Sequence, residues 1–280
     1  MGWPGSLRLD YRSDDLTGVP RTVVHDRHEG PLRILASLYP EAPAVCHNVL
    51  VHPPGGIVGG DTLGIVATLA PRCHALITTP GATRFYRSAG EAATQTLQAT
   101  LAEDARLEWL PLETIAHSGC IAENRLRFEL AAGAEMIGWD LLALGLPASD
   151  DAFALGRFTQ QIELPGQWLE CAVVDATDKH LLDSPLGWAG RRVLCTMWLA
   201  AGAALVPARR DALLDSARTA CADHELRATA GATSAHTKLI VLRVLSARVE
   251  PAMNLLTQVW ARWREQAWAL PACAPRVWRT

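Results

Sequence analysis

The sequence of 280 residues predicts a mainly β fold with a small helical part at its C-terminal end. Two observations predict this fold class. Short runs with period-two apolar alternation fill about the first 200 residues, and helical periodicity is confined to about the last 80. Turn sequences rather than helices separate the short runs, which indicates antiparallel or solenoidal β-structure. No linker rich in Gly, Ser or Pro divides the chain, so we expect one domain over residues 1–280, β-rich over about 1–200 and mixed α/β over about 201–280.

Strands are expected wherever apolar and polar residues alternate along the chain. Residues 63–69 and 96–101 alternate Leu, Ile or Ala with Thr, Gln or Gly, with one valine in the first run. Residues 125–130 give the clearest half-buried strand, because three apolar residues alternate there with two arginines and a glutamate. Residues 193–199 show the same period. Turn signals bound these runs, for example the two prolines and two glycines of residues 53–56.

Helices are expected only in the last part of the chain. Pro207 suits the first turn of a helix whose apolar face contains Leu213 and Ala217. A strand is expected next, over residues 239–245. Pro251 then begins a second helix, whose apolar stripe steps by three and four residues through Met253, Leu256, Trp260, Trp263, Ala267 and Leu270. We interpret Trp260 and Trp263 as core anchors; the alternative is a helix that binds a partner.

Composition and charge exclude several classes of protein. Hydrophobic residues make up 49% of the chain and charged residues 20%, which excludes a disordered chain. The net charge of −3 disfavours a nucleic-acid-binding protein. Seven cysteines without a C-x-x-C pair suit a reducing compartment. Residues 1–11 lack the apolar core of a signal peptide, and the uncharged run of residues 193–208 is short for a membrane span, so we expect a cytoplasmic protein.

No motif of a common catalytic centre is present in the sequence. It lacks both the G-x-S-x-G elbow and the G-x-x-x-x-G-K-[ST] phosphate loop. The spacing of the histidines and cysteines does not support a structural zinc site. Acidic residues in apolar or turn surroundings are the remaining candidates, namely Asp61, Asp140 and Glu170. Their structural alternatives are an Asx-type turn for Asp61 and a hydrogen-bonded buried acid for Asp140 and Glu170.

Four segments carry a more specific signal. They are residues 52–63 (HPPGGIVGGDTL), 76–88 (LITTPGATRFYRS), 108–115 (EWLPLETI) and 275–280 (PRVWRT). In sequence and in order these segments resemble the signature of the UreD family of urease accessory proteins, and they span most of the chain. Arg84 stands where the family often has lysine. Residues 145–156 depart from the family pattern at Leu146, Asp150 and Asp151.

The resemblance implies a β-helix-like fold of stacked sheets with a small C-terminal part of two helices. It also implies a scaffold in urease maturation rather than an enzyme. Such proteins bind the urease apoprotein and the partner UreF, through which the GTPase UreG is recruited. Nickel in transit is the only metal implied, and no cofactor is expected to stay bound. The resemblance implies that Asp61, in the first matching segment, and Asp140 and Glu170, between the third and the fourth, are transient nickel-passage residues rather than a stable site.

We expect these three carboxylates to face an internal, water-filled passage. The arginines nearest to Asp140, which are Arg127 and Arg157, are more than ten residues away, so water or a distant arginine has to compensate a buried charge. Two other functions stay open at this point. One is a β-helical carbohydrate-active enzyme that uses Asp140 and Glu170, and the other is a metalloenzyme built on the scattered histidines.

Overall fold

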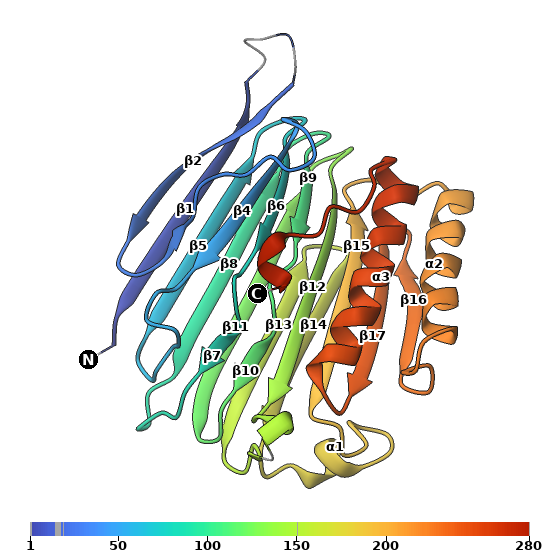
Figure 1. The fold of residues 1–280 in the computed structure, drawn as a ribbon. Helices are drawn as coiled ribbons and strands as arrows, with labels where there is room; N and C mark the ends of the chain where they lie inside the picture. The colour runs from blue at the N-terminus through green and yellow to red at the C-terminus, as the bar shows by residue number, and fades with distance from the viewer. Residues whose placement is uncertain (1, 15–17, 19, 150, 280) are drawn as a thin grey trace.

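Two β-sheets packed face to face form most of the molecule, and two helices cover the outer face of the second sheet (Figure 1). The computed structural model describes residues 2–14, 18, 20–149 and 151–279. The first sheet has the strand order β14 (Trp168–Asp175), β13 (Gly156–Leu164), β11 (Cys120–Leu130), β8 (Ala93–Leu101), β5 (Thr62–Leu69), β1 (Pro4–Ser13) and β2 (Thr22–Glu29).

The second sheet lies opposite the first and carries the helices. Its main strand order is β16 (Ala230–His236), β17 (Leu239–Ser246), β15 (Val193–Ala201), β12 (Glu135–Leu144), β9 (Arg106–Trp109), β6 (His74–Thr78), β4 (Val45–Val51) and β3 (Arg33–Ile34). Two short strands extend it beside β12, namely β10 (Thr114–Ala116) and β7 (Thr83–Phe85). The helices are α1 (Lys179–Asp183), α2 (Pro207–Ala222) and α3 (Val249–Trp268), with the 3₁₀ turns η1 (Pro147–Ser149) and η2 (Arg276–Arg279).

The chain winds in coils that alternate between the two sheets. From β4 it crosses to β5, returns to β6, and repeats this crossing through β8, β9, β11, β12 and β13. Each strand lies parallel to the equivalent strand of the previous coil. The expected mainly β, β-helix-like fold of stacked sheets is therefore confirmed. Antiparallel strands extend this arrangement at its sides, since β2 follows β1, β14 follows β13, and β15, β17 and β16 continue the second sheet.

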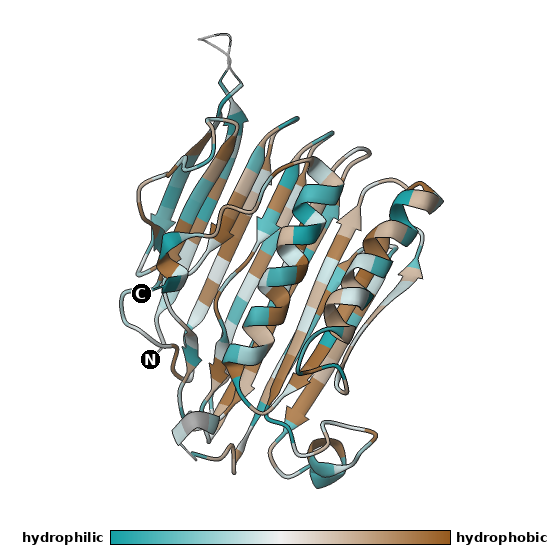
Figure 2. Ribbon diagram, turned by 45° about the vertical axis from the view of Figure 1, so that its right-hand side comes forward, coloured by the Kyte–Doolittle hydropathy of each residue, from teal (hydrophilic) through white to brown (hydrophobic). Residues whose placement is uncertain are grey.

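Rows of buried apolar residues hold the coils in register. Ile65, Leu97, Leu126 and Ile162 are partners on four adjacent strands, and all four are buried between the sheets. Figure 2 shows the same alternation as hydrophilic and hydrophobic bands along the strands. A slip of one residue would turn such a row outward, so the period-two pattern fixes which residues face the interior.

Both expected C-terminal helices are present, with small differences in their limits. Pro207 begins α2 as expected. Helix α3 begins at Val249 rather than at Pro251, which lies in the first turn, where a missing N–H breaks no helical hydrogen bond. The sequence did not predict the short α1 or the edge strand β16. None of the described helices is long and apolar enough to span a membrane.

A buried ion network joins α3 to the second sheet. Arg264 of α3 is fully buried, and its guanidinium donates to Glu108 of β9 at 3.1 Å and to Glu41 at 2.5 Å. Glu108 also accepts hydrogen bonds from His74 at 2.7 Å and from Trp260 at 2.6 Å. Burial alone would raise the pKa of Glu108, but His74 and Arg264 outweigh it and lower that pKa. Trp260 and Trp263 are both completely buried, so their predicted role as core anchors is confirmed.

Candidate functional site

Three amide side chains form a row in the interior face of the first sheet. Gln95, Asn124 and Gln160 are register partners on β8, β11 and β13. Gln95 Nε2 donates to Asn124 Oδ1 at 3.2 Å, and Asn124 Nδ2 donates to Gln160 Oε1 at 3.3 Å. Each amide is a polar exception among apolar residues that point the same way. The row therefore places a line of hydrogen-bonding groups across the apolar space between the sheets.

A second polar row faces the amides from the other sheet. Asp140, Thr196 and Arg243 are register partners on β12, β15 and β17. Asn124 Nδ2 links the two rows by donating to Asp140 Oδ1 at 3.3 Å. Glu170 of β14 accepts from Thr196 Oγ1 at 3.0 Å and from Arg243 Nε at 3.2 Å. We call this set the polar layer; it consists of Gln95, Asn124, Gln160, Asp140, Thr196, Glu170 and Arg243.

The two acids of the polar layer differ in how their charge is compensated. Asp140 is only 7% exposed, and none of the described residues forms an ion pair with it. Burial raises the pKa of Asp140 to about 7, and the negative charge of Glu170 adds to this effect. Glu170, in contrast, is neutralised by Arg243, a residue 73 positions away in the sequence. Among the residues that the structure describes, the distant arginine expected as compensation therefore exists for Glu170 and not for Asp140.

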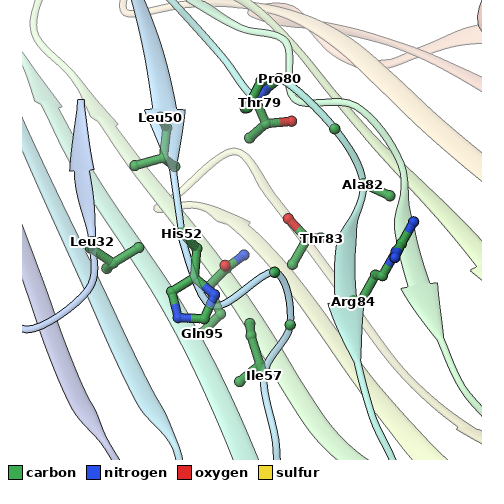
Figure 3. Close-up of a pocket in the computed structure, with 13 residues that line it drawn as sticks. Leu32, Leu50, His52, Ile57, Thr79, Pro80, Ala82, Thr83, Arg84 and Gln95 are labelled. Carbon is green, nitrogen blue, oxygen red and sulfur yellow. The ribbon is translucent and has the colours of Figure 1, made fainter. Parts of the chain in front are cut away.

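The polar layer reaches the outside of the molecule at two places. At one end Gln95 lines a cavity of about 180 Å³, together with His52, Thr79 and Thr83 (Figure 3). At the other end the Arg243 side chain is 50% exposed. Because polar groups face one another between these ends, the layer offers a route of hydrogen-bonding groups through an otherwise apolar interior.

Two buried nitrogen atoms near this route lack a hydrogen-bond partner in the part of the chain that the structure describes. They are Nε2 of Gln160, which belongs to the polar layer, and Nε1 of Trp198, which lies two residues after Thr196 on β15. Buried donors in folded proteins are almost always paired with protein or with water. Water molecules between the sheets would satisfy both donors.

The structure places Asp61 outside the polar layer. Its two carboxylate oxygens accept hydrogen bonds from the backbone N–H groups of Trp3 at 2.8 Å and Val58 at 3.0 Å. This carboxylate thereby ties the loop before β5 to the start of the chain. Burial lowers the pKa of the nearby His52, and the charge of Asp61 partly offsets this lowering. Of the three candidate acids, the fold thus brings together Asp140 and Glu170 but not Asp61.

The loop 52–60 that supports the cavity depends on its glycines. A Cβ atom at Gly59 would lie 2.3 Å from Ser88 Oγ and 2.8 Å from the carbonyl oxygen of Glu91. Gly59→Val should therefore lower the free energy of unfolding by at least ~2 kcal/mol and reduce the yield of folded protein. Gly231→Val on β16 is the matched control, because no atom lies within 4 Å of its Cβ position. A Gly59→Val protein as stable as the control, yet inactive in maturation, would instead identify the loop as a contact site.

Sequence reasoning missed the amides of the polar layer, although a signal for them was present. In the strand around residue 126, every second residue is apolar except Asn124, and Gln95 and Gln160 interrupt their strands in the same way. Arg243 had no such signal, because only the pairing of β15 with β17 brings it to Glu170.

The remaining sequence-based candidates do not form a site in the described residues. These residues contain no group of three or more His, Cys, Asp or Glu side chains that could hold a metal ion. In the segment 145–156, Asp150 lies outside the described residues. Gly145 adopts a φ of +72°, which favours glycine and keeps a turn at the end of β12.

Comparisons with known proteins point to one family. A family model described as "UreD urease accessory protein" matches residues 4–279. A protein of Leptothrix cholodnii named "Urease accessory protein UreD" is 62% identical over 280 residues, which cover 100% of both chains. Proteins of the same name from Paracidovorax citrulli and Variovorax paradoxus are 58% and 56% identical and cover at least 99% of each chain.

Proposed function

Because the chain belongs to the UreD family of urease accessory proteins, we propose that it is a non-catalytic scaffold for urease maturation in the cytoplasm. In this proposal it binds the urease apoprotein and UreF, and it recruits the GTPase UreG through UreF. The name carried by relatives that match its full length supports a place in urease maturation. The individual partners follow from the family resemblance and are part of the proposal.

We further propose that nickel, as the cargo of this assembly, crosses the protein along the polar layer. The observation that carries this proposal is the buried Asp140, an acid without a cation partner among the described residues, within a polar row that reaches a cavity at one end and Arg243 at the other. Nickel(II) binds imidazole and thiolate tightly. Carboxylate, amide and hydroxyl oxygens bind it more weakly, which suits an ion that has to leave again.

The residues of the polar layer would contribute in different ways. Burial raises the pKa of Asp140 to about 7, so this acid exchanges its proton near neutral pH. A divalent cation beside it would favour the ionised form, so arrival of the ion would release a proton. Gln95 and Asn124 supply amide oxygens between the cavity and Asp140. Passage roles for Glu170, which Arg243 already neutralises, and for Asp61 stay predictions.

Two measurements test the proposal. First, the chain should co-purify with UreF and the urease apoprotein when the three are expressed together. Second, a triple variant, Asp61→Asn, Asp140→Asn and Glu170→Gln, should keep these partners but activate urease about tenfold more slowly under limiting nickel, the factor for ~1.4 kcal/mol of lost attraction. Glu129→Gln, an exposed acid on the outer face of β11, is the control. A triple variant that activates urease at the parental rate would contradict passage along these acids.

A further inference from the structure

One ion pair closes the space between the two sheets at the end of the polar layer. Glu170 lies on β14, the edge strand of the first sheet, and Arg243 lies on β17, next to the edge strand of the second. In the described structure β14 pairs only with β13, so no strand pairing joins the two sheets at this point. The ion pair between Glu170 and Arg243 therefore links the sheets through side chains.

An opening lies beside this ion pair. Ala172 is two residues after Glu170 on β14 and so lies on the same, inward side of the strand, yet it is exposed. Its register partner on β13 is Gln160, an amide of the polar layer that is only 6% exposed. Nε2 of Gln160 lacks a hydrogen-bond partner among the described residues. The opening therefore lies next to a buried donor that water entering from outside would satisfy.

The two members of the ion pair differ in how firmly they are held. The Arg243 side chain is 50% exposed, so water can solvate its guanidinium when that group leaves Glu170. An ion pair with one partner this exposed contributes little to stability. The Glu170 side chain is only 15% exposed and keeps a second hydrogen bond, from Thr196 Oγ1 at 3.0 Å. The carboxylate is therefore fixed in place, whereas the guanidinium is free to move.

The charges of the polar layer favour exchange of the guanidinium for a divalent cation. Arg243 neutralises Glu170, but none of the described residues forms an ion pair with Asp140. The two acids interact with each other, since the charge of Glu170 contributes to the raised pKa of Asp140. A divalent cation near both carboxylates carries enough charge to neutralise both. A guanidinium or a monovalent cation carries half of that charge, so it leaves one carboxylate uncompensated.

We propose that Arg243 is a gate for the polar layer, which it closes beside Ala172 by pairing with Glu170 and opens when a divalent cation displaces it. In the open state the cation neutralises Glu170 and Asp140, the proton of Asp140 passes to water, and the guanidinium extends into solvent. This inference rests on the proposed function, because it takes the cation from the proposed passage. It adds a residue that selects for divalent charge and gives Glu170 a role in that passage.

Binding of manganese(II) to the free, full-length chain tests the gate without any partner. Manganese(II) prefers carboxylate and carbonyl oxygens, so it avoids the exposed histidines that would bind nickel(II). Arg243→Gln removes the competing charge and keeps a polar side chain. It should bind manganese(II) at least about tenfold more tightly than the parental chain, as measured by electron paramagnetic resonance of the free ion. Loss of a merely structural arginine would lower stability but would not raise this affinity.

Further variants assign the effect to the ion pair. Arg243→Lys keeps the charge and should bind manganese(II) more nearly as the parental chain does than as Arg243→Gln does. Arg125→Gln on the outer face of β11 is the matched control, because it removes an arginine that is 53% exposed and pairs with Glu123. Adding Glu170→Gln to Arg243→Gln should abolish the rise in affinity. Thermal unfolding shows whether each free variant is folded, and Arg243→Met provides the same test if Arg243→Gln does not fold.

Three results would overturn the gate. They are an Arg243→Gln chain that binds manganese(II) only as tightly as the parental chain, an equal rise in Arg125→Gln, and a rise that persists when Glu170→Gln is added. Each would leave the proposed function standing, because co-purification with UreF and the urease apoprotein is measured separately. A parental chain that binds neither partner would remove the proposed function, whereas the manganese(II) titrations would still decide whether Arg243 competes with a divalent cation for Glu170.

Discussion

Replacing Arg264 by methionine should lower the free energy of unfolding by about 3–5 kcal/mol, the range for breaking a buried ion pair by removing one partner. The Arg264 side chain is completely buried, and so is the carboxylate of Glu108 that it contacts. Methionine fills a similar length but donates no hydrogen bond. The carboxylates of Glu108 and Glu41 would then lie in the same buried region with one positive charge fewer to compensate them. Urea denaturation of the parental chain and the variant measures the loss.

Two further variants separate loss of charge compensation from loss of packing. Arg262→Met changes a more exposed arginine on the same helix, whose guanidinium donates to the Ser216 carbonyl at 3.3 Å, and should change stability by no more than about 0.5 kcal/mol. The double variant Arg264→Met, Glu108→Gln removes the uncompensated charge and should be more stable than Arg264→Met alone. A double variant less stable than the single one would show that packing, not charge, is the cause.

The layered β architecture was predictable because its cause is local. A strand that is buried on one face has to alternate, and residues 63–69 and 125–130 show that alternation plainly. Alternation does not say which strand is the neighbour, so the sequence pattern left antiparallel and solenoidal arrangements open. Helix α1 escaped prediction because its five residues are too few to show a helical period. Strand β16 escaped because its small residues, Ala, Gly, Thr and Ser, carry little apolar alternation.

The candidate site was predictable only in part, because its geometry depends on register. The sequence alone shows that Asp140 and Glu170 are acids within apolar runs. That Glu170 has an arginine partner depends on the pairing of β15 with β17, which brings residue 243 beside residue 196. That Asp61 binds two backbone N–H groups depends on where Trp3 and Val58 lie. Neither contact can be predicted from the residues that flank these acids in the sequence.

Asp140→Asn should stabilise the protein, and by more at pH 8 than at pH 5. Burial raises the pKa of Asp140 to about 7 in the folded chain, against 3.8 for the unfolded reference. As the pH rises from about 4 to about 7, the unfolded chain loses this proton while the folded chain keeps it. Stability therefore falls with rising pH by about 1.4 kcal/mol per pH unit in this window, and it levels off above the folded pKa. Asparagine does not titrate, and its oxygen can still accept from Asn124.

Urea denaturation at pH 5 and pH 8 tests the direction of this pH dependence of stability. Groups that do not interact with Asp140 titrate alike in the parental chain and the variant, so the difference between the two proteins reports Asp140 together with its interaction with Glu170. The increase in the free energy of unfolding caused by Asp140→Asn should be larger at pH 8 than at pH 5 by on the order of 2 kcal/mol. Glu129→Gln, which removes an exposed acid paired with Arg127 on the outer face, should show no comparable growth. An equal gain at both pH values would mean that Asp140 does not hold its proton into the neutral range.

The same substitution connects stability to the proposed passage. In the proposed function, Asp140 lowers the stability of the fold, and its carboxylate attracts nickel. Asp140→Asn should therefore combine a more stable fold with slower urease activation under limiting nickel. The deficit relative to the parental chain should widen from pH 6 to pH 8, because the parental carboxyl ionises over that range. Activation assays with UreF, UreG and apo-urease at fixed nickel measure this difference. A variant that is more stable at pH 8 and activates urease as fast as the parental chain at every pH would show that Asp140 has no role in nickel passage.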